Sequence, residues 1–318
     1  MNKIEFGDCR ETMRRWKEQG IKAQTCVTSP PYYGLRDYGH DGQIGLEETP
    51  EEYIAAMVEV FRCVWDVLED DGTLWLNIGD SYYNYRPGQG QRQGKQSIAS
   101  QKFSEVEICH KRGLKLDGFK EKDLIGIPWM LAFALRADGW YLRQDIIWHK
   151  PNPMPESVQD RCTKSHEYIF LMSKSQKYYY DHESIKEASV DPEGSANRYK
   201  APFFAGEKHE SGGYSANGAT HTKGMKEFDG SRNKRSVWTV NTKPYAGAHF
   251  AVFPQDLIEP CIMAGAPVGG IVLDPFMGSG TTAQVAQDLG RQYLGCELNL
   301  DYKPLQDKRI SQLSLELV

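Results

Sequence analysis

Helical and strand-like hydrophobic patterns alternate along most of the chain. Between residues 50 and 70, and again between 281 and 289, apolar side chains recur at helical spacing and predict amphipathic helices. Shorter apolar runs at 25–28, 73–78 and 271–273 are typical of buried strands. This alternation predicts an α/β fold in which helices cover both faces of a mainly parallel sheet.

The ends of these elements carry their own signals. Thr49 is a favourable helix N-cap, Pro50 suits the first helical position, and the acidic residues that follow suit the positive end of the helix dipole. The pair Asp71-Gly72 predicts the end of this helix. The pattern also predicts a helix that ends near residue 20, helices over 123–136 and 255–264, and strands over 3–6, 141–148, 168–172 and 292–296.

Composition limits the class of protein. Hydrophobic residues make up 40% and charged residues 25% of the 318 residues, which are ordinary globular values and exclude a collagenous, disordered or membrane-spanning chain. No apolar run approaches the roughly 20 residues that a bilayer requires, and the first residues lack a signal-peptide core, so we expect a cytoplasmic protein without a membrane partner. Seven scattered cysteines without C-x-x-C spacing predict free thiols, and neither a disulfide framework nor a metal site.

Charge is unevenly distributed along the chain. The formal net charge is -5, yet two polar stretches, 85–122 and 198–243, are basic. Such stretches are commonly solvated loops, and they also suit contact with phosphate groups. The second stretch contains Arg232, Lys234 and Arg235, which are therefore candidate contacts to a nucleic acid.

A strand, a glycine-rich turn and a helix follow one another near the C-terminus. After the strand at 271–273, residues 274–283 read D-P-F-M-G-S-G-T-T-A, and the helix then begins. The glycines permit a tight turn, and Glu297 at the end of the next strand can accept both hydroxyls of a ribose. A nucleoside cofactor is indicated. Two other interpretations of this segment stay open. One is a dinucleotide site, because 278–283 matches G-x-G-x-x-A, and the other is a strand-turn-helix corner without a ligand.

A second candidate site follows the strand at 25–28. Two prolines remove backbone donors, so the exposed polar groups are acceptors, namely the Ser29 hydroxyl and the Pro30 carbonyl. Together they can hold an NH2 group, and Tyr32 offers a flat face on which a base can stack. A proline-rich turn with an incidental tyrosine is the alternative when this motif stands alone.

Both motifs together resemble the permuted, β-class DNA amino-methyltransferases that use S-adenosylmethionine. The resembling segments are 28–32 (T-S-P-P-Y), 274–282 (D-P-F-M-G-S-G-T-T), 295–299 (G-C-E-L-N), 249–254 (H-F-A-V-F-P) and the opening 7–9 (G-D-C). The resemblance implies a Rossmann-like, seven-stranded and mostly parallel sheet with one antiparallel strand and a permuted motif order. It further implies a catalytic part at 1–150, an inserted target-recognition region at 151–240 and a cofactor-binding part at 241–318.

The same resemblance assigns roles to individual residues. Phe276, Gly278, Gly280 and Thr281, with Asp274, would form the cofactor pocket. Glu297 would bind the ribose, Asp8 the adenine amino group, and Phe250 would flank the methionine end. The catalytic target-base site would consist of Ser29, Pro30, Pro31 and Tyr32.

Methylation of an exocyclic amino group needs little general acid–base catalysis. Hydrogen bonds from the NH2 group to Ser29 and Pro30 would direct the nitrogen lone pair at the sulfonium methyl, and water can remove the surplus proton. Methylation at a ring carbon would need a cysteine nucleophile. We interpret Cys261, Cys9 and Cys296 as packing residues rather than nucleophiles.

The base, the nucleic acid and the partners are less tightly specified. Serine at position 29 resembles the cytosine N4 branch of the family more than the adenine N6 branch, which stays an alternative. A methylase of RNA or protein glutamine and a binding module without catalysis are further alternatives. Double-stranded DNA is the expected partner, contacted through 151–240 and through Arg36, for which a surface salt bridge is an equal alternative. A cognate restriction endonuclease is a candidate partner, and the host is expected to be a bacterium or its phage.

Overall fold

The computed structural model describes residues 1–35, 39–40, 42–83, 115–194, 229–242 and 253–311. The chain divides into two compact units. One unit consists of residues 1–181 together with 236–318, and the other of residues 182–235. Within the second unit, the short strands β6 (Glu187–Ala188) and β7 (Ser231–Arg232) pair in antiparallel fashion.

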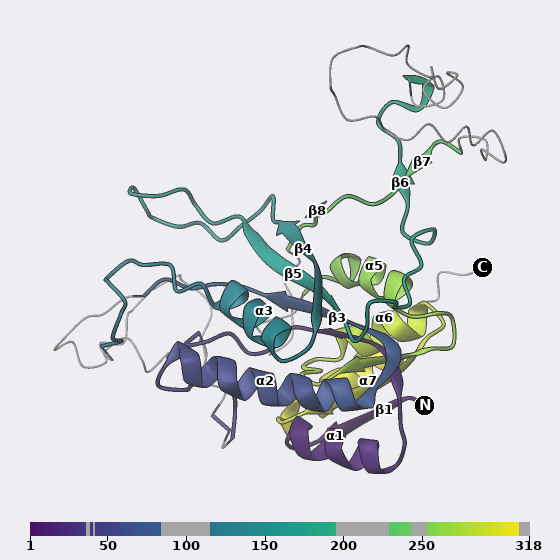
Figure 1. Ribbon diagram of the computed structural model, residues 1–318, viewed down its shortest axis with the longest axis horizontal. Helices are drawn as coiled ribbons and strands as arrows, with labels where there is room; N and C mark the ends of the chain where they lie inside the picture. Colours follow the sequence, from purple (N-terminus) through teal and green to yellow (C-terminus); the bar gives the residue numbers. More distant parts are fainter. Residues whose placement is uncertain (36–38, 41, 84–114, 195–228, 243–252, 312–318) are drawn as a thin grey trace, which may run out of the picture. The chain divides into compact units, whose positions relative to one another are not determined.

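The first unit is organised by one large sheet (Figure 1). Within the described residues, its eight strands lie in the order β1-β10-β9-β2-β3-β5-β4-β8. Every described pairing is parallel except those of β5, which runs antiparallel to both β3 and β4. Seven strands with one reversed strand match the predicted sheet, and β8 adds a short eighth strand at the edge. The bounds are β1 Lys3–Phe6, β2 Ala23–Thr28, β3 Leu68–Ile78, β4 Tyr141–His149, β5 His166–Ser173, β8 Val237–Thr239, β9 Ile271–Asp274 and β10 Gln292–Glu297.

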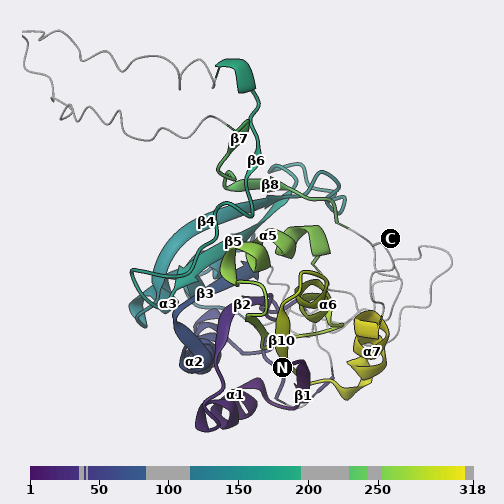
Figure 2. The same ribbon diagram turned by 90° about the vertical axis from the view of Figure 1, so that its right-hand side faces the viewer.

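Helices cover both faces of the sheet, as the alternating pattern predicted (Figure 2). On one face α1 contacts α2 and α2 contacts α3, whereas α5, α6 and α7 follow one another on the other face. Among the helices of the described chain, none is long and apolar enough to cross a membrane. The bounds are α1 Cys9–Glu18, α2 Pro50–Val67, α3 Ile127–Ala137, α5 Gln255–Gly265, α6 Thr281–Asp288 and α7 Lys303–Ser311, with a 3-10 turn at Leu300–Tyr302.

The helix α2 shows both the strength and the limit of local signals. Its start is confirmed, because the Thr49 side chain accepts the Glu52 N–H and the Glu52 side chain accepts the Thr49 N–H. Its predicted end at 71–72 is wrong, since α2 ends at Val67 and β3 begins at Leu68. Leu68 is fully buried and pairs with Ala23 of β2, so a tertiary contact ends the helix early.

The start of α3 was also predicted too early, at residue 123. The helix begins at Ile127, after Gly126 with a left-handed φ of 87°. The Asp80 carboxylate, at the end of β3, accepts the N–H groups of Gly126 and Ile127. An acidic side chain distant in sequence therefore caps this helix, which the local pattern around Pro128 cannot reveal.

Candidate active site

The two motif loops, remote in sequence, leave the sheet side by side. The strands β2 and β9 are neighbouring parallel strands in which Thr25 pairs with Val272 and Cys26 with Leu273. The carboxyl ends of parallel strands lie at the same edge of a sheet, and ligands of open α/β sheets bind there. The loop after residue 28 and the turn after residue 274 therefore meet at this edge.

A buried carboxylate joins the two loops directly. Asp274 accepts a hydrogen bond from the Thr28 hydroxyl (2.6 Å), and its other oxygen accepts one from the Thr282 hydroxyl (2.6 Å). The Phe276 N–H also donates to Asp274 (3.0 Å). Asp274 is 1% exposed, and burial raises the pKa of its carboxyl to about 6. Its oxygens therefore bind the end of β2, the turn and the first turn of α6.

The glycine turn has the backbone that its sequence requires. Gly278 and Gly280 have left-handed φ values of 55° and 87°, and Gly280 is the N-cap of α6. A Cβ atom at Gly280 would lie 3.4 Å from the Cα atom of Gln306. Helix α6 therefore begins at a turn against which helix α7 packs closely.

Helix α7 supplies two buried contacts to the turn that the sequence analysis missed. The Gln306 amide donates to the Gly278 carbonyl (2.7 Å), and the Arg309 guanidinium donates to the Thr281 hydroxyl. Both side chains are buried, although their types are usually exposed. No apolar stripe marks this helix, so hydrophobic periodicity does not reveal it.

Glu297 lies beside the turn, at the end of β10. Its two carboxylate oxygens accept the N–H groups of Gly278 (2.7 Å) and Asn299 (2.8 Å). Burial, with a contribution from the negative charge of Asp274, raises the pKa of Glu297 to about 7. Each oxygen retains a second lone pair, so the carboxylate can still accept hydroxyl groups.

Asp8 is brought to the same edge by β1. Phe6 pairs with Glu297 in the sheet, and the Gly7 N–H donates to the Glu297 carbonyl (2.8 Å). The Asp8 carboxylate is the N-cap of α1 and accepts both the N–H and the guanidinium of Arg10. Hydrogen bonds and charge from Arg10 hold the pKa of Asp8 below its usual value.

The loop after β2 is held by contacts from other elements. The Tyr53 hydroxyl of α2 donates to the Pro31 carbonyl (2.8 Å). The Tyr32 ring lies against Gly79, where an added Cβ atom would be 2.7 Å from Tyr32 Cε2. The Tyr32 hydroxyl donates to Glu167 of β5 (2.8 Å). Ser29, Pro31 and Tyr32 are half-buried and Pro30 is buried.

Comparison with known proteins agrees with this arrangement. A family model described as DNA methylase, of the N6/N4 methyltransferase type, matches residues 23–308. The chain belongs to this family. It is 47% identical to the type II methyltransferase M.SmaI of Serratia marcescens over 97% of this chain and 90% of the relative. It is 45% identical to the type II methyltransferase M.Cfr9I of Citrobacter freundii over 96% of this chain and 86% of the relative.

Solved structures share the fold of this methylase at low sequence identity. The PvuII DNA methyltransferase, described as cytosine-N4-specific, superposes with a TM-score of 0.61 at 15% identity and covers 100% of this chain and 88% of its own. A complex of M1.HpyAVI with SAM gives a TM-score of 0.53 at 17% identity and covers 97% of this chain and 100% of its own. These similarities confirm the Rossmann-like α/β fold.

The predicted DNA contacts belong to the second unit or to segments outside the described residues. Arg36 and Phe250 belong to the segments that the structure leaves undescribed. In the second unit, Arg232 and Arg235 place their Nε atoms 2.9 Å and 3.7 Å from Glu187 Oε1. Lys234 is half-buried in the same unit. The role of these side chains in DNA binding stays a prediction.

Cys9, Cys261 and Cys296 are buried packing residues, as predicted. Cys261 is 1% exposed within α5, and Cys296 is fully buried in β10. Burial raises the pKa of Cys9 to about 12 and that of Cys296 well above its usual value. Thiols held protonated in this way are poor nucleophiles.

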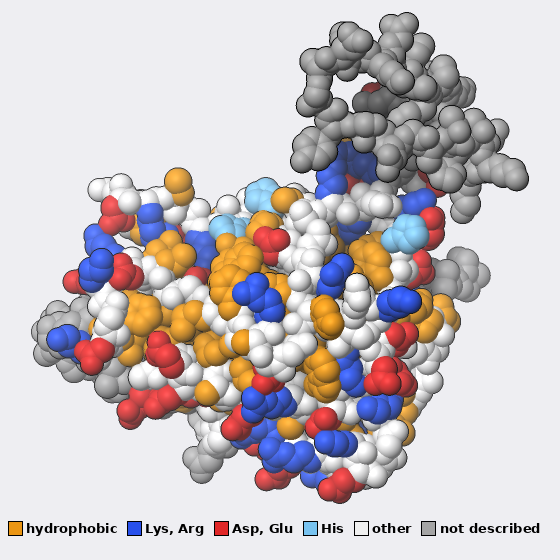
Figure 3. Space-filling view, in the orientation of Figure 1, with side chains coloured by type: hydrophobic (Ala, Val, Ile, Leu, Met, Phe, Trp, Pro, Cys, Tyr) orange, Lys and Arg blue, Asp and Glu red, His pale blue; other side chains and the backbone are white. Residues whose placement is uncertain are grey.

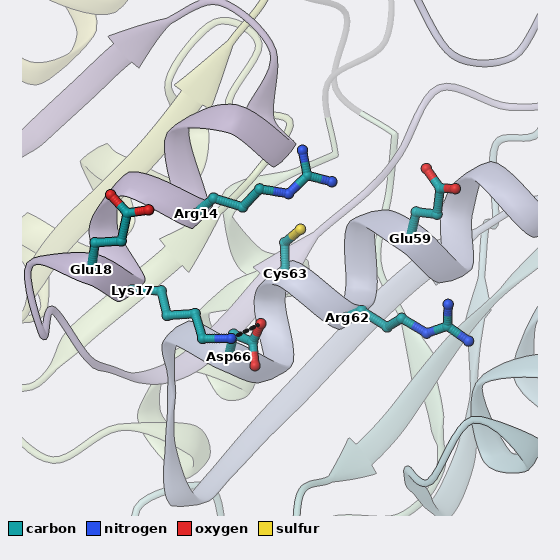
Figure 4. Close-up of a pocket in the computed structure, with 7 residues that line it drawn as sticks. All are labelled: Arg14, Lys17, Glu18, Glu59, Arg62, Cys63 and Asp66. Carbon is teal, nitrogen blue, oxygen red and sulfur yellow. Dashed lines mark hydrogen bonds and ion pairs between the residues drawn. The ribbon is translucent and has the colours of Figure 1, made fainter.

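A surface groove between α1 and α2 contains none of the predicted site residues (Figure 4). It is lined by Arg14, Lys17, Glu18, Glu59, Arg62, Cys63 and Asp66. Its charges are mixed, and Lys17 pairs with Asp66 (2.8 Å). Acidic and basic side chains likewise intermingle over α1 and α2, whereas hydrophobic side chains gather over α3 (Figure 3). The motif loops, rather than this groove, form the candidate site.

The pH dependence of the free energy of unfolding should report the raised pKa of the buried Asp274. Its pKa is about 6 in the folded protein and 3.8 ordinarily, so the folded protein retains a proton that the unfolded chain releases. This stabilisation is complete below about pH 4 and is lost as the pH rises through 6. In the Asp274→Asn variant this proton-linked stabilisation is absent at every pH, because the amide does not titrate. The stability of the unaltered protein relative to the variant should therefore fall by about 2 kcal/mol from pH 4 to 7.

Urea unfolding at a series of pH values measures this difference. The control is Asp307→Asn on α7, where the carboxylate is exposed and pairs with Lys303. A difference between Asp274→Asn and the unaltered protein that stays constant across this pH range would contradict the assignment.

The contact from α7 should stiffen the glycine turn. Gln306→Ala removes the donor to the Gly278 carbonyl, so hydrogen–deuterium exchange of the amides at 278–281 should become faster. Unfolding stability should fall by about 1 kcal/mol. Lys308→Ala changes an exposed neighbour on the same helix and should leave exchange unaltered. Equal exchange in both variants would show that α7 does not hold the turn.

Proposed function

We propose that this protein transfers a methyl group from S-adenosyl-L-methionine to the exocyclic N4 amino group of cytosine in duplex DNA. The observation that carries the proposal is the hydrogen bond from Thr28 to Asp274, which joins the Ser29–Tyr32 loop to the glycine turn. One loop presents acceptors for an amino group, and the other has the features of a nucleoside site. Family membership as a DNA methylase supports the same reaction.

The residues beside the glycine turn fit this cofactor. Within the described residues, the buried Ser279 hydroxyl has no hydrogen-bond partner, and an unpaired buried hydroxyl costs about 1–3 kcal/mol. A polar ligand in the turn could relieve this cost. M1.HpyAVI and TTHA0409 of Thermus thermophilus, which share the fold, were both solved as complexes with this molecule.

Each predicted cofactor residue then has a task, and the contacts of the described ones allow it. Glu297 accepts the ribose hydroxyls, and Asp8, which follows the neighbouring strand β1, accepts the adenine amino group. Phe276 and the glycines line the pocket, and Phe250 flanks the methionine end. Thr281 contributes through its backbone at the α6 N-terminus, because its hydroxyl is bonded to Arg309. Asp274 acts by shaping the turn, since its oxygens bond to Thr28, Thr282 and Phe276.

At the other loop, the chain holds the base and directs its amino group. The cofactor, when bound, supplies an electrophilic methyl group. The Ser29 hydroxyl and the Pro30 carbonyl accept the two N–H bonds, so the nitrogen lone pair is left to point at that methyl group. Pro31 stiffens the loop, and Tyr32 stacks on a base that has left the helix. The nitrogen loses its surplus proton to water, so no general base is required.

The finer assignments rest on particular residues. Serine at position 29 supports cytosine rather than adenine. Residues 151–240 are proposed to recognise the DNA sequence, with Arg36, Arg232, Lys234 and Arg235 as contacts to DNA. Because the relatives are type II methyltransferases, a cognate restriction endonuclease is the proposed partner, in the cytoplasm of a bacterial host.

Labelled methyl transfer tests the reaction. The purified protein is incubated with labelled S-adenosylmethionine and unmethylated bacterial DNA, and the nucleosides are separated by mass spectrometry. We expect N4-methylcytosine. N6-methyladenine would overturn the choice of base but not the reaction class. Absence of methyl transfer to DNA, or transfer to RNA or protein instead, would overturn the proposed function.

Replacing the acceptor hydroxyl should affect catalysis rather than cofactor binding. Ser29→Ala removes one acceptor for the amino group, so kcat should fall by about 100-fold while the Kd for S-adenosylmethionine changes less than twofold. Ser311→Ala, on α7, is the control and should keep the normal kcat. An unchanged kcat in Ser29→Ala would exclude the serine from the reaction.

Cofactor affinity should depend on pH through Glu297. Its pKa of about 7 means that the carboxyl is largely protonated below pH 7, whereas ribose hydroxyls bind best to the ionised form. Affinity should therefore rise by up to tenfold per unit as the pH increases toward 7, and level off above it. Calorimetric titration at pH 6, 7 and 8 should show this change in the unaltered protein and lose it in Glu297→Gln. The same pH dependence in both proteins would assign the titration to another group.

A further inference from the structure

A half-buried polar cluster lies behind the Ser29–Tyr32 loop, and no sequence motif predicts it. We call Tyr32, Asn77, Lys150 and Glu167 the Glu167 network. Glu167 lies near the start of β5, Asn77 near the end of β3, and Lys150 directly after β4. Because β5 runs antiparallel to both neighbours, its start lies at the edge where β3 and β4 end.

Glu167 is the centre of this network. One oxygen accepts the Tyr32 hydroxyl (2.8 Å) and the Asn77 amide (3.3 Å), and the other pairs with the Lys150 ammonium. The Glu167 and Lys150 side chains are only 15% and 17% exposed. The Asn77 amide also donates to the Tyr168 carbonyl (3.1 Å), which fixes its orientation.

The protonation states of Glu167 and Tyr32 determine which groups in this cluster donate hydrogen bonds and which accept them. A carboxylate paired with an ammonium only accepts. The Tyr32 hydroxyl donates to Glu167 (2.8 Å), which is nearer than the alternative acceptor, Asn77 Oδ1 (3.4 Å). Burial, and then the charge of Glu167, raise the pKa of Tyr32 well above its usual value, which keeps the hydroxyl protonated. The Tyr32 oxygen is then free to accept, and the Ser29 hydroxyl donates to it over a long 3.5 Å contact.

This direction matters because an amino group is a hydrogen-bond donor. A Ser29 hydroxyl whose proton points toward Tyr32 turns its lone pairs to other groups, and a target NH2 group requires such an acceptor. The Tyr32 ring is fixed at both ends as well, since its hydroxyl is bound and its Cε2 edge lies against Gly79.

Resting on the proposed methyl transfer, we propose that Glu167 is a positioning residue, which acts through the Tyr32 hydroxyl to fix the stacking ring and to make Ser29 an acceptor for the target amine. Lys150 supports Glu167 by supplying the opposite charge. A purely structural ion pair would stabilise the sheet edge without being coupled to the Tyr32 hydroxyl. Coupling therefore distinguishes the two roles.

A double-mutant cycle measures that coupling. Tyr32→Phe keeps the ring and removes the hydroxyl, whereas Glu167→Gln keeps the size and removes the charge. We expect each change to lower kcat for DNA methylation by about 10-fold to 100-fold, with the Kd for S-adenosylmethionine altered less than twofold. The double variant should be no slower than the slower single variant, because both changes break the same hydrogen bond.

The matched control is Asp145→Asn, which alters an exposed carboxylate on the neighbouring strand β4 and should keep the normal kcat. Losses that multiply in the double variant would show independent roles and overturn the proposal. So would normal kcat in Tyr32→Phe, a result that can be obtained even if Glu167→Gln does not fold. If the unaltered protein methylates no DNA, the proposed function fails and this inference fails with it. Normal kcat in Glu167→Gln overturns only the inference.

Discussion

The hydrogen bond between Thr28 and Asp274 is the constraint on which the site depends. It joins residues 246 positions apart in sequence and fastens the Ser29–Tyr32 loop to the glycine turn. The pairing of β2 with β9 places the loops side by side, and Asp274 adds the turn and the first residues of α6 to the same buried carboxylate. Permuted motif order has no effect on this geometry, because adjacent parallel strands end at one edge whatever their order in the chain.

Carboxylates in two kinds of environment lie at this edge of the sheet. Beside the glycine turn, Asp274 and Glu297 lie among backbone N–H groups and hydroxyls. Their hydrogen-bond partners in the described part of the chain include no cationic side chain, and burial raises the pKa of both carboxyls. Behind the Ser29–Tyr32 loop, Glu167 pairs with the Lys150 ammonium. The first environment suits carboxylates that hold a turn and accept hydroxyl groups. The second suits a carboxylate that only accepts, and thereby sets the direction of neighbouring hydrogen bonds.

Most elements were predicted well because their signals are local. The strand at Lys3–Phe6 and the cap at Thr49 follow from side chains within a few residues, and the structure confirms both. The predicted helix ends were wrong where a residue distant in sequence determines the boundary. Leu68 leaves α2 to pair with Ala23, and Asp80 caps α3 from the end of β3. Helix α7 has no apolar stripe, since its buried side chains are Gln306 and Arg309.

By itself, the sequence determined the local chemistry of this protein: prolines that remove donors after residue 29, glycines that permit the turn at 278 and 280, and an acidic residue at the end of a strand. These features depend on each residue's own backbone and side chain, so they can be read one position at a time. Only the tertiary structure decided which distant groups complete them, such as Glu167 for Tyr32 and Gln306 for Gly278. Such hydrogen bonds need an accuracy of tenths of an ångström between chain segments, and only the packed sheet and helices provide it.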